Sequence, residues 1–268
     1  MIKKDNGFKI TKILSSGTAN PIVNRLSLQF FDILGRNLLS LSQEDSDKIK
    51  KLLFELMKKM LKAEEAKISY LQQEDMAIQK ILSKNGIKFQ QNAISYDDPT
   101  EDLKKKFEDF LINSAISIRK IVKIADVIFN KYFGDGVGAL AKYLSSLFDK
   151  KSLEVKMIEE NTPWIQELFE LRRLVEHDEL ELKPFNVSLQ PDGNVLVSIP
   201  CLANGKVYAR GYIKATLENC LTFCEDIIAL LLNTKCLDGI QIVLIPEDIR
   251  PTLNNFKYKI TLKNPPVF

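Results

Sequence analysis

The chain has a single histidine, His177, among 268 residues, and its four cysteines contain no C-x-x-C pair. Zinc sites in proteins use clustered Cys and His ligands at short, regular spacing. We therefore expect no metal, no cofactor and four reduced thiols, with Cys220 and Cys224 in the core of a helix face. We also expect no serine or cysteine nucleophile, because such a nucleophile needs a histidine as its base and the single histidine belongs to the candidate site described below.

Long apolar runs are also missing. No stretch offers about 18 uncharged apolar residues, the length that a membrane-spanning helix requires. The first residues, MIKKDNGFKI, lack the apolar core of a signal peptide, and HDEL at 177–180 is internal, so it cannot serve as a C-terminal retention signal. These absences predict a cytoplasmic protein with no membrane partner.

The charge is nearly balanced, with a formal net charge of +3, 27% charged residues and 45% hydrophobic residues. These values are ordinary for a globular protein that buries a sizeable core. Binding to a polyanion would therefore depend on local groups of Lys and Arg, and net charge alone predicts no nucleic-acid partner. Two such groups could contact RNA, although a solvated helix face is the usual interpretation of a charge run; they are Lys104–Lys106 and Arg119, Lys120, Lys123 with Lys131.

Hydrophobic spacing predicts helices over the first two-thirds of the chain. A first helix spans about 24–41. Ser42 and Asp45 form a capping-box pattern at the start of a second helix of about forty residues, inside which we expect a kink or break. Segment 87–97 is predicted to be a polar loop. Asp98 and Pro99 then begin a third helix that ends near Phe133.

The glycine-rich segment GDGVG at 134–138 is expected to be a turn, because a phosphate-binding loop would follow a strand and end in GK[ST]. A short helix at about 137–148 follows. Thr162 and Pro163 then predict the start of another helix, which ends at His177. Acidic residues at 97–102 could hold a hard cation, but helix capping accounts for them as well.

After His177 the pattern alternates, which is typical of strands. We predict a β-meander from LELKPFNVSL, NVLVSIP and KVYARGYI, a final helix over 214–234, and C-terminal strands at IQIVLI and FKYKITL. The fold class is therefore mainly α, a helical bundle with a small antiparallel meander inserted before the last helix, α+β overall. The predicted regions are 1–98, with the long helix; 99–235, a bundle that includes the β-insert 180–213; and 236–268, strands that pack on the insert.

The segment ELRRLVEHDEL, residues 170–180, carries most of the functional signal. Guanidinium groups grip phosphates with parallel hydrogen bonds, and imidazole exchanges a proton near neutral pH. This combination suits phosphodiester cleavage. On a straight helix His177 shares a face with Arg173, whereas Arg172 and His177 diverge by roughly 140° and could meet only if the helix unwinds. The candidate site residues are Arg172, Arg173, Glu176 and His177.

Arg172 and His177 form an R-x4-H arrangement at a helix end, which resembles the motif of HEPN-domain proteins, helical bundles of which many are metal-independent ribonucleases. The resemblance covers about residues 100–235, and Arg173 stands where the family commonly has a short polar residue. It implies an RNA partner, attack of a 2′-hydroxyl on the adjacent phosphate, a homodimer that brings two copies of His177 to one groove, and a toxin or defence setting.

Two other interpretations remain open. Arg172 and Arg173 could simply pair with helix carboxylates such as Glu176 and balance the helix dipole, which favours cations at its C-terminal end. The chain would then be a non-catalytic module that binds a protein partner through the long helix and the β-rich tail.

Overall fold

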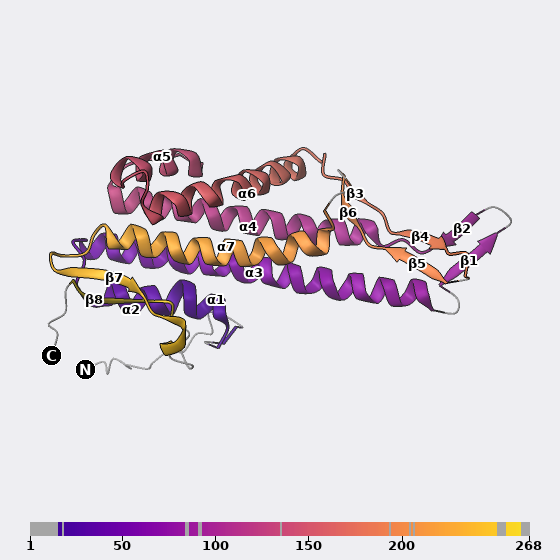
Figure 1. The fold of residues 1–268 in the computed structure, drawn as a ribbon, viewed down its shortest axis with the longest axis horizontal. Coiled ribbons are helices and arrows are strands. Elements are labelled where there is room, and N and C mark those ends of the chain that lie inside the picture. The colour runs from indigo at the N-terminus through magenta and orange to yellow at the C-terminus, as the bar shows by residue number, and fades with distance from the viewer. Residues whose placement is uncertain are drawn as a thin grey trace, which may run out of the picture.

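The computed structural model describes residues 16–17, 19–83, 86–90, 93–134, 136–192, 194–203, 205, 207–250 and 256–263. The N-terminal stretch MIKKDNGFKI lies outside these residues. The fold is mainly α-helical with small antiparallel strand pairs, which confirms the predicted fold class. Figure 1 shows an elongated bundle with β-structure near both ends and helices α5 and α6 along one side.

The centre of the bundle is a pair of long helices, α3 (Gln43–Leu82) and α4 (Thr100–Phe129). The Ser42 hydroxyl accepts the Asp45 N–H at 3.0 Å, which confirms the predicted cap. Contrary to the expected kink or break, α3 is one continuous helix of 40 residues. Its buried stripe lies against α4 over much of its length, and burial of that stripe supplies most of a helix's stability.

Residues 87–97 are not the predicted polar loop. Strands β1 (Ile87–Gln90) and β2 (Ala93–Tyr96) pair antiparallel and connect α3 to α4. The Tyr96 hydroxyl donates to the Phe185 carbonyl and so joins this hairpin to the β-insert. A long-range contact of this kind is not visible in the local sequence of two strands of four residues each.

The N-terminal part is also divided differently from the predicted single helix. A short helix α1 (Pro21–Val23) leads through a π-helical turn (Asn24–Leu28) into α2 (Gln29–Gly35). Leu26 and Phe30 are fully buried, as their helical spacing indicated.

Helix α5 (Val137–Leu147) is followed by α6 (Leu153–Glu176). The predicted start of α6 at Thr162 and Pro163 is wrong, because Ser152 caps the helix and Pro163 lies inside it. Proline in a helix interior removes one backbone hydrogen bond. The Asn161 and Thr162 side chains donate to the carbonyls of Met157 and Ile158 in the turn before the proline.

The β-insert is a hairpin in two paired pieces, and the predicted three-stranded meander is wrong. KVYARGYI is not a strand, because helix α7 (Ala209–Asn233) begins within it. Arg210 pairs with Glu74 and Asp75 of α3, and this contact favours the helix over the alternating pattern. The hairpin contains four short strands, β3 (Leu182–Lys183), β4 (Asn186–Leu189), β5 (Val195–Ser198) and β6 (Cys201–Leu202). Strand β4 pairs with β5, and β3 pairs with β6.

The C-terminal strands β7 (Ile240–Leu244) and β8 (Tyr258–Leu262) form a second hairpin. The prediction that they pack on the β-insert is wrong. They pack instead on α7 and α2, near the other end of the bundle (Figure 1). Gln29 holds them there, because its side-chain oxygen accepts the N–H groups of Lys257 at 2.6 Å and Tyr258 at 2.8 Å.

The buried hydrophobic residues form one cluster that extends from Ile22 to Leu232. Residues on both sides of position 98, where the first predicted region ends, belong to this cluster. Within the described part of the chain, no helix combines the length and apolar character needed to cross a membrane.

Candidate functional site at the end of helix α6

Helix α6 remains regular up to its last residue, Glu176, and does not unwind before His177. The His177 N–H donates to the Arg173 carbonyl at 3.1 Å. Asp178 then takes a left-handed conformation with φ 57°, and the N–H groups of Asp178 and Glu179 donate to the carbonyls of Val175 and Leu174. This pattern is a Schellman motif, which closes the helix end.

The closed end decides which arginine can act with His177. Along a regular helix, positions four apart differ by roughly 40° and positions five apart by roughly 140°. Arg173 and His177 therefore share a face, and Arg172 points elsewhere. The predicted convergence of Arg172 with His177, which required an unwound helix, is wrong.

Arg172 is embedded in the protein surface. Its side chain is 13% exposed, its Nη2 lies 2.5 Å from the Glu176 carboxylate, and its Nε is buried without a hydrogen-bond partner among the described residues. Both members of this pair are candidate site residues. The ion pair joins two successive turns of α6. For Arg172 the structure therefore agrees with the alternative interpretation, in which the arginine pairs with a helix carboxylate.

Arg173 is 49% exposed and forms a two-pronged contact with Glu170, in which Nε and Nη2 lie 2.8–3.2 Å from the carboxylate oxygens. Hydrogen bonding from Arg173 holds the pKa of the Glu170 carboxyl below its usual value, and the same contact raises the pKa of the guanidinium. A second carboxylate, that of Glu179, lies 3.8 Å from Nη1.

His177 is exposed to solvent. Among the described residues its imidazole has no hydrogen bond or ion pair, including with Arg172, Arg173 or Glu176. The neighbouring carboxylates are directed elsewhere, since Glu176 contacts Arg172 and Asp178 lies 3.9 Å from the Lys104 ammonium. The imidazole is therefore free to contact a ligand.

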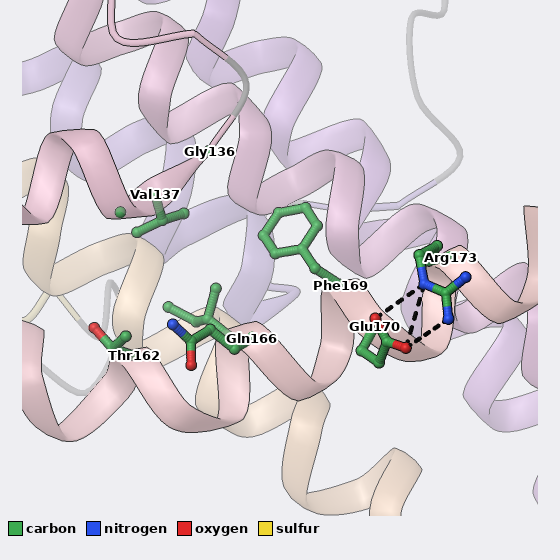
Figure 2. A pocket seen from close by; sticks show the side chains of 9 residues that line it. Gly136, Val137, Thr162, Gln166, Phe169, Glu170 and Arg173 are labelled. Carbon is green, nitrogen blue, oxygen red and sulfur yellow. Dashed lines mark hydrogen bonds and ion pairs between the residues drawn. The ribbon is translucent and has the colours of Figure 1, made fainter.

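A cleft of about 410 Å³ lies between the start of α5 and the second half of α6. Figure 2 shows Val137 and Phe169 beside it, with the Glu170–Arg173 pair at one end. The sequence pattern did not reveal this cleft, because it forms only when α5 folds back on α6. Gly136 and Gly138 of the GDGVG segment line it, and Asp135 lies outside the described residues.

The proposed basic patch on α4 is divided between two sides of the helix. Lys120 lies 2.5 Å from Glu55 of α3, whereas the Arg119 guanidinium lies 5.5 Å from the ring centre of Phe169 on α6. Lys104 and Lys105 lie within 4.0 Å of Glu108 and Asp102, respectively, and the Lys104 side chain is only 20% exposed.

No group of three or more His, Cys, Asp or Glu side chains suited to a metal ion occurs in the described ranges. In the acidic segment at 97–102, Asp98 accepts from the Thr100 N–H and hydroxyl, and Asp97 pairs with Lys80. Cys220 and Cys224 are fully buried, as predicted.

No protein-family model, no curated protein and no solved structure matches this chain.

Proposed function

We propose that this chain is an RNA-binding protein with a HEPN-like helical bundle in which Arg173, rather than the Arg172 of the R-x4-H motif, acts with His177 on a phosphate, with metal-independent RNA cleavage as the reaction. The observation that carries the proposal is the placement of an exposed, unpaired imidazole one helical turn after a half-exposed guanidinium on the same face. The cleft beside Arg173 offers space for part of a ligand.

The ion pair with Glu170 does not prevent this role. Both side chains are exposed, and exposed ion pairs contribute about 0–1 kcal/mol. A phosphate can accept two parallel hydrogen bonds from the guanidinium, so it competes well for Arg173. Arg172 is less available, because reaching a ligand would expose its packed side chain and break its contact with Glu176.

In the proposed reaction a 2′-hydroxyl attacks the adjacent phosphorus and the bond from phosphorus to the 5′-oxygen breaks. One imidazole takes the proton of the attacking hydroxyl, and the leaving oxygen must receive a proton. Arg173 stabilises the negative charge that develops on the phosphate oxygens. Because each chain has one histidine, a homodimer with two copies of His177 at one groove supplies both the base and the acid.

The direct test is incubation of the purified protein with labelled single-stranded RNA in the presence of a chelator. The proposal predicts cleavage by the parent, loss of cleavage in His177→Ala, and resistance of RNA that carries a 2′-deoxy sugar at the cleaved position. Activity should fall more steeply than in proportion to protein on dilution, because the dimer dissociates. No cleavage by the parent between pH 6 and 8, or unchanged cleavage by His177→Ala, contradicts the proposal.

A second candidate function, a non-catalytic protein-interaction module, is favoured by a different observation. A groove of about 420 Å³ lies between the start of α6, the second half of α7 and β7–β8. Leu153, at its edge, is 81% exposed, and Leu244 is 52% exposed. Its apolar lining comprises Leu153, Met157, Ala229, Leu230, Ile242 and Leu244.

The two candidates predict different assemblies. Leu153 and His177 lie at opposite ends of α6, and a helix of 24 residues is roughly 36 Å long. A dimer formed through the Leu153 groove would therefore keep its two copies of His177 apart. Dimerisation that Leu153→Asp abolishes and Leu189→Asp leaves intact, measured by light scattering, favours the interaction module.

A further inference from the structure

Three aromatic side chains meet where α4 ends and α5 packs against it. Tyr143 of α5 lies 5.0 Å from Phe129 and 5.2 Å from Phe133, measured between ring centres, and the two phenylalanines are 6.2 Å apart. The edge-to-face geometry of two of these contacts fixes the rings relative to one another. Local sequence spacing does not reveal this cluster, because its members come from a helix end, a loop and a second helix.

Lysines lie over these rings. The Lys131 ammonium is 4.3 Å from the ring centre of Tyr143 and 5.5 Å from that of Phe133. From the end of α7, Lys235 lies 5.9 Å from the ring centre of Phe129. Lys131 and Lys235 have no ion-pair partner in the part of the chain that the structure describes.

Tyr132 extends the same surface. It follows Lys131 directly, its ring lies 4.8 Å below the Lys123 ammonium, and it is 75% exposed. We name Phe129, Lys131, Tyr132, Tyr143 and Lys235 the lysine–aromatic surface. It belongs to the end of the bundle where α4 and α7 terminate, whereas α6 ends towards the β-insert (Figure 1).

The dipoles of α4 and α7 explain part of this arrangement, because cations are favoured near helix C-termini. They do not explain why a tyrosine ring that is 75% exposed follows Lys131 directly at the bundle end that also carries Lys235, when neither lysine has a carboxylate partner in the described part of the chain. Unpaired lysines attract phosphates, and exposed rings stack on bases, whatever the base sequence. A protein surface that carries both features matches the repeating unit of a single nucleic-acid strand.

We propose that the lysine–aromatic surface binds single-stranded nucleic acid, with Tyr132 stacking on a base and Lys131 and Lys235 contacting phosphates. A duplex fits less well, because its bases are already stacked and paired. The surface is separate from the Arg173–His177 pair, so this binding requires no cleavage and does not rest on the function proposed above.

The test uses a labelled dT10 oligonucleotide and fluorescence anisotropy, because DNA lacks the 2′-hydroxyl that the proposed cleavage needs. Tyr132→Ala should weaken binding by roughly tenfold, within the range measured for loss of base stacking on aromatic side chains. Tyr208→Ala is the control, since Tyr208 is also exposed, at 54%, but precedes the start of α7.

A double variant, Lys131→Ala with Lys235→Ala, tests the phosphate contacts. It should lower the slope of log affinity against log salt by about 1.4, since each lost phosphate contact on a single strand contributes about 0.7. The control, Lys156→Ala with Lys214→Ala, removes two exposed lysines elsewhere and should leave the slope unchanged.

The proposal is overturned if the parent does not bind dT10 at low salt, if Tyr132→Ala binds as the parent does, or if the control double variant changes the slope equally. Tighter binding of a duplex of the same length would also overturn it. RNA cleavage by the parent is scored separately, so the failure of this surface and the failure of the Arg173–His177 pair remain distinguishable.

Discussion

The backbone N–H of His177 donates to the carbonyl of Arg173 at 3.1 Å, one helical turn earlier in α6. This hydrogen bond keeps the helix regular, so His177 lies on the side of α6 that carries Arg173, whose guanidinium is half exposed at the edge of a cleft. Arg172 is held on another side by Glu176. The R-x4-H spacing drew attention to this helix end, but the geometry supports an R-x3-H pair.

Attachment of the C-terminal hairpin should depend on Gln29, which is fully buried. Gln29→Leu would leave the N–H groups of Lys257 and Tyr258 without their acceptor and would remove a donor to the buried Glu225. We expect the free energy of unfolding to fall by about 2–4 kcal/mol, because each unsatisfied buried group costs about 1–3 kcal/mol. Urea denaturation measures this change.

Gln43→Leu is the matched control, because Gln43 is exposed at the start of α3. Its effect should stay within about 0.5 kcal/mol, as is usual for surface positions. Equal effects of the two substitutions would show that Gln29 does not hold the hairpin.

The ion pair between Glu55 of α3 and Lys120 of α4 should make a small, pH-dependent contribution to stability. The hydrogen bond from Lys120, at 2.5 Å, holds the pKa of the Glu55 carboxyl below its usual value. A carboxyl with a lowered folded-state pKa stabilises the fold above its unfolded pKa, and this stabilisation is lost as pH falls through the folded pKa.

Glu55→Gln should therefore lower stability at pH 7 and have little effect near pH 3. Because the Glu55 side chain is 38% exposed, solvent screening limits the difference at pH 7 to a few tenths of a kcal/mol, roughly 0.3–0.5. Glu159→Gln, at an exposed position on α6, is the comparison and should show no such trend. A loss of stability in Glu55→Gln that becomes larger as pH falls would contradict this prediction.

The four thiols should differ in reactivity. Cys220 and Cys224 are fully buried, and burial raises the pKa of both thiols, so they form little of the reactive thiolate. Cys201 and Cys236 are partly exposed, and burial also raises the pKa of Cys236.

A thiol reagent at pH 8 should therefore modify Cys201 first, Cys236 more slowly, and the remaining two only after unfolding. Mass spectrometry of partly modified protein identifies the sites. Modification of Cys220 or Cys224 in the folded protein at the rate seen for Cys201 would refute the packing of α7 described here.

Local signals predicted the helical part of the fold well. The cap at Ser42, the stripe of α3 and the buried face of α4 each depend on residues a few positions apart, which a sequence displays directly. The start of α7 was predicted too late, because Val207, Ala209 and Gly211 alternate with larger side chains and resemble a strand. Ion pairs from Arg210 to α3, 135 residues away, favour the helix and are not visible in local spacing.

The candidate site was predicted only in part. Its four residues do lie in consecutive turns at the end of α6. The sequence could not show that Asp178 would adopt a left-handed conformation and close the helix, and this detail determines which arginine shares a face with His177. The cleft beside Arg173 depends on the packing of α5, which no short motif encodes.

The most direct test of the account compares two matched substitutions, Arg172→Met and Arg173→Met, in the RNA cleavage assay. Methionine keeps an unbranched apolar side chain and removes the guanidinium. We expect Arg173→Met to lower kcat/KM by about 100-fold or more, as removal of a donor to a developing oxyanion does elsewhere. Arg172→Met should remain within a few-fold of the parent. Loss of activity in a folded Arg172→Met variant, with activity retained in Arg173→Met, would contradict the account.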